Sequence, residues 1–150
     1  MDSTDLNHND CWHFTHLGFA VEIRRWGLDN PHLCDGKGCW NYYVYLHEKT
    51  TPDFDKLWLE AYHLPSFPNI LHHDYEKLSI CQDINWHGEV TWYEKLGHDK
   101  GHRTVKLGCD YQHFLDSENG YNTTIEQVVS DAKVTCGELY LLFHPEVQHA

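Results

Sequence analysis

The sequence predicts an α+β protein, in which a mostly antiparallel sheet of about five strands packs with two helices in a single domain. Short segments alternate apolar and polar residues with the period of a strand, and two longer segments carry apolar residues at helical spacing. The length of 150 residues suits one domain. An aromatic content of 14% favours a folded core over a disordered chain.

The strands are predicted from alternation and residue type. In "FAVEIRRW", residues 19–26, Phe19, Val21 and Ile23 alternate with small or polar residues. "WNYYVYLHE", residues 40–48, is aromatic and β-branched, which is typical of a strand. Further strands are expected at 77–81, 86–93 and 103–110. Residues 1–10 are expected to form a loose polar tail, which leaves 11–150 as the domain.

Two helices are predicted from their caps and apolar faces. In "TTPDFDKLWLEAYH", Thr51 suits the N-cap and Pro52 the first turn. In "TTIEQVVSDAKVTCG", Thr123 and Glu126 have the spacing of a capping box, and Gly137 suits the C-terminal stop. The following "ELYLLF" fits either a final strand or an extension of this helix.

Charge and composition exclude several classes of function. The chain has 11 basic and 23 acidic residues and a net charge of −12. This charge repels phosphate backbones, so general nucleic-acid binding is not expected, whereas basic protein partners are favoured. No apolar run reaches the ~18 residues of a membrane span, and "MDSTDLNHND" is not a secretory signal. A reducing cytoplasm is therefore expected, with the six cysteines as thiols.

The stretch from residue 84 to residue 116 gathers polar side chains between strand-like residues. If 86–93 and 103–110 pair with their apolar residues on one side, one allowed register places His87 opposite Asp110. His113 and Asp116 follow Asp110 in a D-x-x-H-x-x-D spacing that folds back over the strand end. Glycines in both strands would open the backbone to a ligand. Two interpretations stay open: a ligand pocket, or a hydrogen-bonded structural cluster on a polar face.

"INWHGEVTW" followed by "LGCDYQHFLD" resembles a family of small, uncharacterised proteins of tailed bacteriophages. The family pattern is a strand V-H-G-G-(L/I)-T-(F/Y), then G-F-D-C-A-H-x-x-D, then a helix. The resemblance covers about residues 78–136, and the matching positions are Ile84, His87, Gly88, Thr91, Gly108, Asp110, His113 and Asp116. Glu89 replaces the second glycine, and Tyr111 and Gln112 replace small residues. The resemblance implies a phage gene with an accessory, counter-defence role in the host cell cytoplasm.

The first functional hypothesis is a binding protein that neutralises a host defence protein, such as a basic nucleic-acid-binding effector, or that sequesters a small nucleotide signal. The candidate ligand-binding residues are His87, Gly88, Glu89, Asp110, His113, Asp116, and the basic Arg103 and Lys106. The alternatives are a metal-dependent hydrolase with His87, Asp110, His113 and Asp116 as ligands and Glu89 as general base, and a structural phage protein without a ligand.

A second constellation suggests a metal. "CWHFTH" offers Cys11 and His13, and "CDGKGC" offers Cys34 and Cys39, which together are four ligands of the types that zinc takes. These three cysteines lie outside apolar patterns, whereas Cys81, Cys109 and Cys136 are expected in the core. The alternative interpretation is thiols beside surface histidines.

Overall fold

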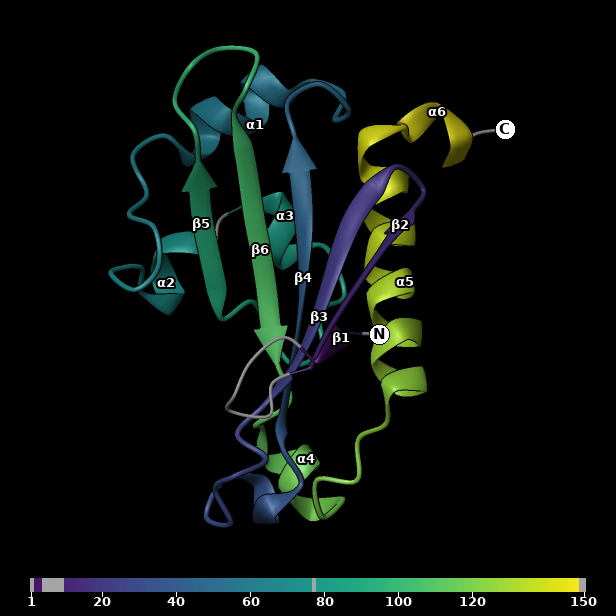
Figure 1. Cartoon of the computed structure of the whole chain (residues 1–150). Helices are drawn as coiled ribbons and strands as arrows, with labels where there is room; N and C mark the ends of the chain where they lie inside the picture. The colour runs from purple at the N-terminus through teal and green to yellow at the C-terminus, as the bar shows by residue number, and fades with distance from the viewer. Residues whose placement is uncertain (1, 4–9, 77, 149–150) are drawn as a thin grey trace.

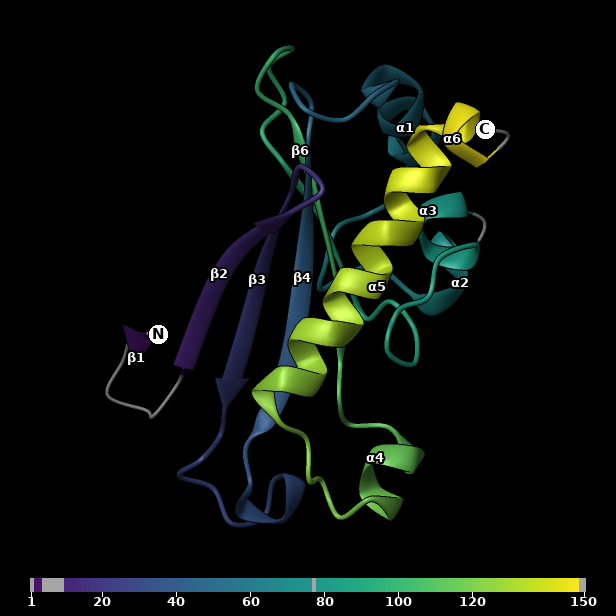
Figure 2. The same cartoon turned by 90° about the vertical axis from the view of Figure 1, so that its right-hand side faces the viewer.

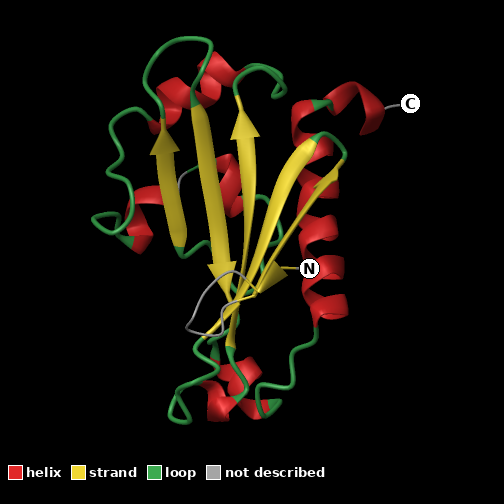
Figure 3. Cartoon of the chain, viewed as in Figure 1, coloured by secondary structure: helices red, strands yellow, loops and turns green. Residues whose placement is uncertain are grey.

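The computed structural model describes residues 2–3, 10–76 and 78–148. It contains one antiparallel sheet with the strand order β1-β2-β3-β4-β6-β5 (Figures 1 and 3). The strands are β1 (Asp2–Ser3), β2 (Asp10–His16), β3 (Phe19–Trp26), β4 (Cys39–His47), β5 (Trp92–Leu96) and β6 (Thr104–Asp110). The helices are α1 (Phe54–Ala61), α2 (His72–Tyr75), α3 (Ser79–Gln82), α4 (Phe114–Glu118), α5 (Ile125–Phe143) and α6 (Pro145–Gln148), with a 3-10 turn at Cys34–Gly36. The predicted α+β class is confirmed.

The two faces of the sheet differ. Helices α1, α2, α3 and α5 lie on one face, and Figure 2 shows no described helix on the other, here called the helix-free face. The long helix α5 contacts β3 and β4, and one core cluster fills the space between helices and sheet. Removing these apolar side chains from water is the main force that holds the layers together. The fully buried members of the core cluster include Ile23, Val44, Leu107, Val128, Ala132 and Leu139.

Most strands lie where the sequence predicts them. Residues 19–26 form β3 with the predicted bounds, because their alternation puts Val21 and Ile23 into the core. The strand β4 begins and ends one residue before its predicted range, and β6 begins one residue after its predicted start and ends where predicted. The strand β2 was not predicted, although Trp12 and Phe14 alternate with polar residues and pack against the core.

The prediction of a strand at 86–93 was wrong. Residues 86–91 form a loop, and the strand β5 begins at Trp92. It pairs Trp92 with Gly108, so the predicted register, which placed Glu89 there, is three residues off. The alternation was misleading because Trp86 and Val90 are buried from a loop, where the Trp86 indole donates to the carbonyl of Ile80 at 2.9 Å.

The helix ends also required correction. The strand predicted at 77–81 is the short helix α3, although residue 77 lies outside the described residues. Gly137 does not end α5, which continues to Phe143 because the following turns still pack on the core. The N-cap is Thr124 rather than Thr123, and its hydroxyl accepts from Gln127 N at 3.2 Å.

The remaining predictions concern the N-terminal segments. Helix α1 begins after Asp53, so Thr51 is not its N-cap and is buried instead. Asp2 and Ser3 pair with Cys11 and Asp10, so this part of the predicted loose tail belongs to the sheet. The rest of the tail, residues 1 and 4–9, lies outside the described residues. Among the described helices, none is both long enough and apolar enough to cross a membrane.

Candidate functional site

Four predicted site residues come together where β6 ends. Figures 1 and 2 show the chain running from the end of β6 to α4. Asp110 is the last residue of β6, His113 precedes α4, and Asp116 lies in α4. His87 comes from the loop before β5. We call these four residues, with Gly88, Tyr111 and Asp131, the His–Asp cluster.

His87 is held from several sides. Its Nε2 lies 2.8 and 3.0 Å from the two carboxylate oxygens of Asp116, and its Nδ1 lies 3.8 Å from Oδ2 of Asp131. The ring stacks on Tyr111 with centroids 3.7 Å apart. The backbone amide of His87 donates to the hydroxyl of Tyr42 at 3.1 Å. Because both ring nitrogens face carboxylates, His87 fastens its loop to α4 and α5.

Sequence reasoning missed Asp131, which reaches the cluster from α5. The hydroxyl of Tyr111 donates to Asp131 Oδ2 at 2.5 Å. Burial, together with this carboxylate, raises the pKa of Tyr111 well above its ordinary range. The only signal in the sequence was the position of Asp131 at the border of the predicted apolar face, four residues before the buried Thr135. That position does not reveal a tertiary partner.

The ring of His113 lies against one side of Gly88. A Cβ atom on Gly88 would lie 2.3 Å from His113 Nε2, and Gly88 has φ +71°, which favours glycine. His113 Nε2 lies 3.4 Å from Asp110 Oδ1 without hydrogen-bond geometry, and its backbone amide donates to Asp116 at 3.0 Å. Gly108 is likewise covered by the Tyr43 ring. Gly108 is buried, so the prediction that it opens the backbone to a ligand was wrong, whereas Gly88 is exposed and His113 occupies only the side on which a Cβ would lie.

The geometry favours the structural interpretation of the His–Asp cluster. The rings of His87 and His113 lie 5.9 Å apart, and each faces a carboxylate of the same chain. Among the described residues, the one set of three or more side chains whose metal-ligating atoms all lie within 4.8 Å of one another is Cys11, His13 and Glu22. The four residues proposed as ligands of a hydrolase do not form such a set, so this alternative gains no support.

The two basic candidates lie away from the His–Asp cluster. Arg103 donates from Nε to Glu48 at 2.8 Å and also bonds Asp55, while its guanidinium lies over the rings of Phe54 and Trp58. The Arg103 hydrogen bond lowers the pKa of Glu48 to about 2. Both carboxylates neutralise the guanidinium, so Arg103 is not presented to a phosphate.

Lys106 points onto the helix-free face. Its Nζ lies 3.4 Å from Glu22 and 4.4 Å from the centre of the Tyr43 ring. Burial alone would raise the pKa of Glu22, but the charges of Lys106 and Arg24 outweigh it, so this pKa lies below its ordinary value. The eight predicted ligand-binding residues thus lie in three separate places: at the His–Asp cluster, at Arg103 and at Lys106. Glu89 is exposed and follows Gly88 of the His–Asp cluster in the chain.

The four predicted zinc ligands separate into two pairs. Cys11 Sγ lies 3.1 Å from His13 Nε2, and Cys34 Sγ lies 3.0 Å from Cys39 Sγ. Only the first pair belongs to the metal-ligating set, in which Glu22 is the third member. All three cysteines are buried, contrary to prediction. Burial and the neighbouring Cys34 raise the pKa of Cys39 to about 12.

Helix α4 presents apolar side chains beside the His–Asp cluster. Phe114 and Leu115 are 75% and 77% exposed, whereas Asp116, the next residue, is buried. The bonds of Asp116 to His87 and to the His113 amide fix the rotation of this short helix. Because successive helical residues point about 100° apart, holding Asp116 inward directs the two preceding side chains toward solvent.

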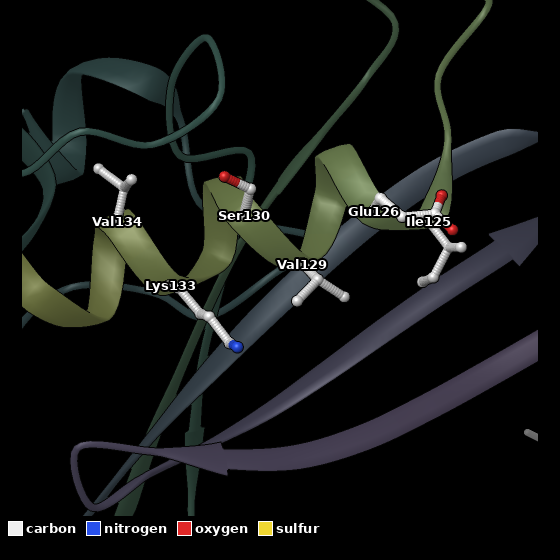
Figure 4. A pocket seen from close by; sticks show the side chains of 6 residues that line it. All are labelled: Ile125, Glu126, Val129, Ser130, Lys133 and Val134. Carbon is white, nitrogen blue, oxygen red and sulfur yellow. The ribbon is translucent and has the colours of Figure 1, made fainter.

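A separate pocket lies along α5 (Figure 4). It has a volume of about 610 Å³ and is lined by Ile125, Glu126, Val129, Ser130, Lys133 and Val134. One carboxylate and one ammonium group balance its charge. The cavity therefore offers no preference for an anionic ligand such as a nucleotide.

Comparison with models of protein families, with curated proteins and with solved structures finds no match to this chain.

Proposed function

We propose that this chain is an accessory binding protein of a tailed bacteriophage. It acts in the host cell cytoplasm by occupying a basic, nucleic-acid-binding defence protein. The observation that carries the proposal is the pair Phe114 and Leu115, which are about three-quarters exposed on a helix whose orientation is fixed. The phage origin is supported by the motif resemblance around residues 84–116.

The pair on α4 has the properties of an interface anchor. Single exposed apolar residues are common on protein surfaces, but two adjacent large ones on an immobilised helix form a small patch ready for a pocket on a partner. Binding energy in interfaces concentrates in a few such side chains. Because α4 is already held by Asp116, docking would cost little additional ordering of the backbone.

Charge selects the kind of partner. Glu118 is exposed one turn after Phe114 and Leu115, and Asp110 and Glu89 lie on the neighbouring segments. Lys37, which bonds Gly120 and Asn122, places one cation at the turn after α4. The whole chain carries −12. A positively charged rim around an apolar pocket complements this surface, and the opposite charges would speed association.

The nucleotide variant of the hypothesis is less well supported. Arg24, Arg103 and Lys106 each face a carboxylate of the chain at 3.4 Å or less. A phosphate would have to displace these carboxylates. The geometry therefore favours a basic protein over an anionic small molecule.

Capture from host lysate with immobilised chain tests the proposal. The test variant is Phe114→Ser/Leu115→Ser, and the matched control is Leu59→Ser/Tyr62→Ser, which removes two side chains that are 69% and 59% exposed at α1. We expect the wild type and the control to enrich the same basic protein, and the α4 variant to lose it. Enrichment should fall as salt rises, because surface charges are screened.

A functional assay completes the test. The purified candidate should bind the wild type directly, and expression of the wild type should restore plating of a phage that the defence system blocks. The α4 variant should fail in both measurements. Equal capture by the wild type and the α4 variant, or capture of acidic proteins alone, would overturn the proposal.

A further inference from the structure

A second group of chemically active side chains lies on the helix-free face and does not include the residues of α4 on which the proposed function rests. Cys11 and His13 are two residues apart on β2, so their side chains lie on the same face of the sheet. The β2–β3 register pairs His13 with Glu22 and Cys11 with Arg24. Strand geometry thus brings a thiol, an imidazole and a carboxylate together.

The distances between these groups suit a tetrahedral metal ion. Cys11 Sγ lies 3.1 Å from His13 Nε2 and 3.9 Å from Glu22 Oε2, and all three atoms lie within 4.8 Å of one another. Zinc bonds of about 2.3 Å to sulfur and about 2.0–2.2 Å to nitrogen or oxygen place neighbouring ligand atoms about 3.3–3.6 Å apart. Small side-chain rotations would bring both separations into this range.

Neighbouring side chains fix the carboxylate. Glu22 is 3% exposed, and its Oε1 accepts from the Tyr45 hydroxyl at 3.1 Å and faces Lys106 Nζ at 3.4 Å. Such outer contacts orient a ligating carboxylate in metal sites. His13 is exposed, so an ion can reach the site from solvent. Oε2 accepts from Arg24 Nε at 3.1 Å, and the Arg24 side chain is 47% exposed, so solvent can replace this bond.

We propose that Cys11, His13 and Glu22 bind a zinc ion on the helix-free face, with the fourth coordination position left to water or an outside ligand. The thiolate and the carboxylate neutralise the ion, and the mixed sulfur, nitrogen and oxygen ligands suit zinc better than magnesium or calcium. The ion would fasten β2 to β3. Arg24 competes with it for Oε2.

Titration of the metal-free full-length chain with cobalt, as a spectroscopic substitute for zinc, tests the site. We expect a thiolate-to-cobalt charge-transfer band at one ion per chain, which zinc then displaces. Cys11→Ser should abolish the band, and Cys81→Ser, which changes a half-buried cysteine outside the site, should keep it. Zinc should also raise the melting temperature of the wild type, since a ligand of the folded state stabilises it.

Three further variants separate metal binding from folding. His13→Ala changes an exposed residue and removes a ligand. It should weaken zinc binding by at least about 10-fold, because loss of an outer-shell partner alone costs about 10-fold to 100-fold in metal affinity. Glu22→Gln should weaken it as well, whereas Arg24→Gln should tighten it severalfold. A band that survives in Cys11→Ser and His13→Ala, or that is lost in Cys34→Ser/Cys39→Ser, would overturn the inference. So would the absence of any cobalt or zinc binding.

Discussion

At the scale of single residues, the His–Asp cluster shows why its motif needs these residue types. Gly88 adopts a positive φ and lies under the His113 ring, and His87 fills the space between Asp116 and Tyr111. Each residue restricts its neighbour. The residues of the motif therefore form contacts that hold a loop, a strand end and two helices together.

Gly88→Ala should destabilise the chain more than an ordinary glycine substitution. The new Cβ would overlap His113 in addition to straining the backbone, and we expect a loss of about 2–4 kcal/mol in the free energy of unfolding. Gly101→Ala is the control, because Gly101 has φ +95° but, among the described residues other than its two chain neighbours, none has an atom within 4 Å of its Cβ position. It should lose only about 1–2 kcal/mol. Urea denaturation measures both, and equal losses would contradict the packing argument.

His87 and Asp116 should be energetically coupled. His87→Ala and Asp116→Ala each leave a polar partner without its hydrogen bond, and we expect each to cost about 1–3 kcal/mol. Because they share one interaction, the double variant should cost about 0.5–3 kcal/mol less than the sum of the single variants. A double-mutant cycle by urea denaturation measures this difference. Additive losses would mean that the contact contributes nothing.

The sequence identifies residues of the cluster but not their partners. The D-x-x-H-x-x-D spacing singles out Asp110, His113 and Asp116 because a short turn brings them together locally. Asp131 and Glu22 could not be assigned in this way, because their partners are distant in the chain. Asp131 bonds Tyr111, and Glu22 lies beside Cys11. Their roles depend on how α5 and β3 pack.

At the scale of elements, one buried hydroxyl on α5 bonds both the sheet and the loop that carries His87. Thr135 Oγ1 lies 2.7 Å from the Tyr42 hydroxyl on β4 and donates to the carbonyl of Asn85 at 2.5 Å. Both contacts lie beside the loop that carries His87. This hydroxyl therefore links α5 to both the sheet and the loop, in addition to the bonds that Asp131 and Glu138 of α5 make with Tyr111 and Asn85.

Thr135→Val keeps the shape of the side chain and removes these bonds. We expect a loss of about 1–3 kcal/mol in the free energy of unfolding, because Tyr42 and Asn85 lose a partner. Thr124→Ala, which removes only the N-cap of α5, should cost about 1 kcal/mol. Thermal denaturation compares the two variants. In Thr135→Val, but not in Thr124→Ala, the amide signals of residues 84–87 should also shift in NMR spectra.

The ion pair of Glu48 and Arg103 connects the end of β4 to the start of β6, and it predicts an acid-dependent loss of stability. The folded-state pKa of Glu48, about 2, lies below its ordinary 4.5. Its contribution is therefore complete above about pH 4.5 and is lost as pH falls through about 2. In Glu48→Gln, the urea midpoint should depend less on pH over this window than it does in the wild type. Glu126→Gln, at an exposed position on α5, should leave the wild-type slope in place.

Elements were predictable where the pattern of the chain alone fixes them. β3 has its predicted bounds because one side of the strand enters the core at every second residue. The loop at 86–91 imitates this pattern, since Trp86 and Val90 are buried without a strand. Gly137 looks like a helix end, yet packing of Leu139 against the core carries α5 past it. Tertiary burial decided both cases, and sequence periodicity does not record it.

At the scale of the whole molecule, charge should govern behaviour in solution. The net charge is −12 with neutral histidines and would reach about +2 if all fourteen were protonated. We expect electrophoretic mobility to change sign, and solubility to be lowest, near the sequence pI of 5.5. Binding to a basic partner should weaken as pH falls from 7.5 toward 6. Affinity that is unchanged over this range would contradict an electrostatic contribution.

The position of β4 at the centre of the sheet has a practical consequence. One side of the strand, Trp40, Tyr42, Val44 and Leu46, belongs to the core. Its other side, facing away from the helices, carries Asn41, Tyr43, Tyr45 and His47. A fluorophore or spin label at His47 would report on events at the helix-free face, while the native Tyr42 resonance would report on the interior from only five residues away. Probes on the two sides of one strand can thus report separately on the helix-free face and on the core.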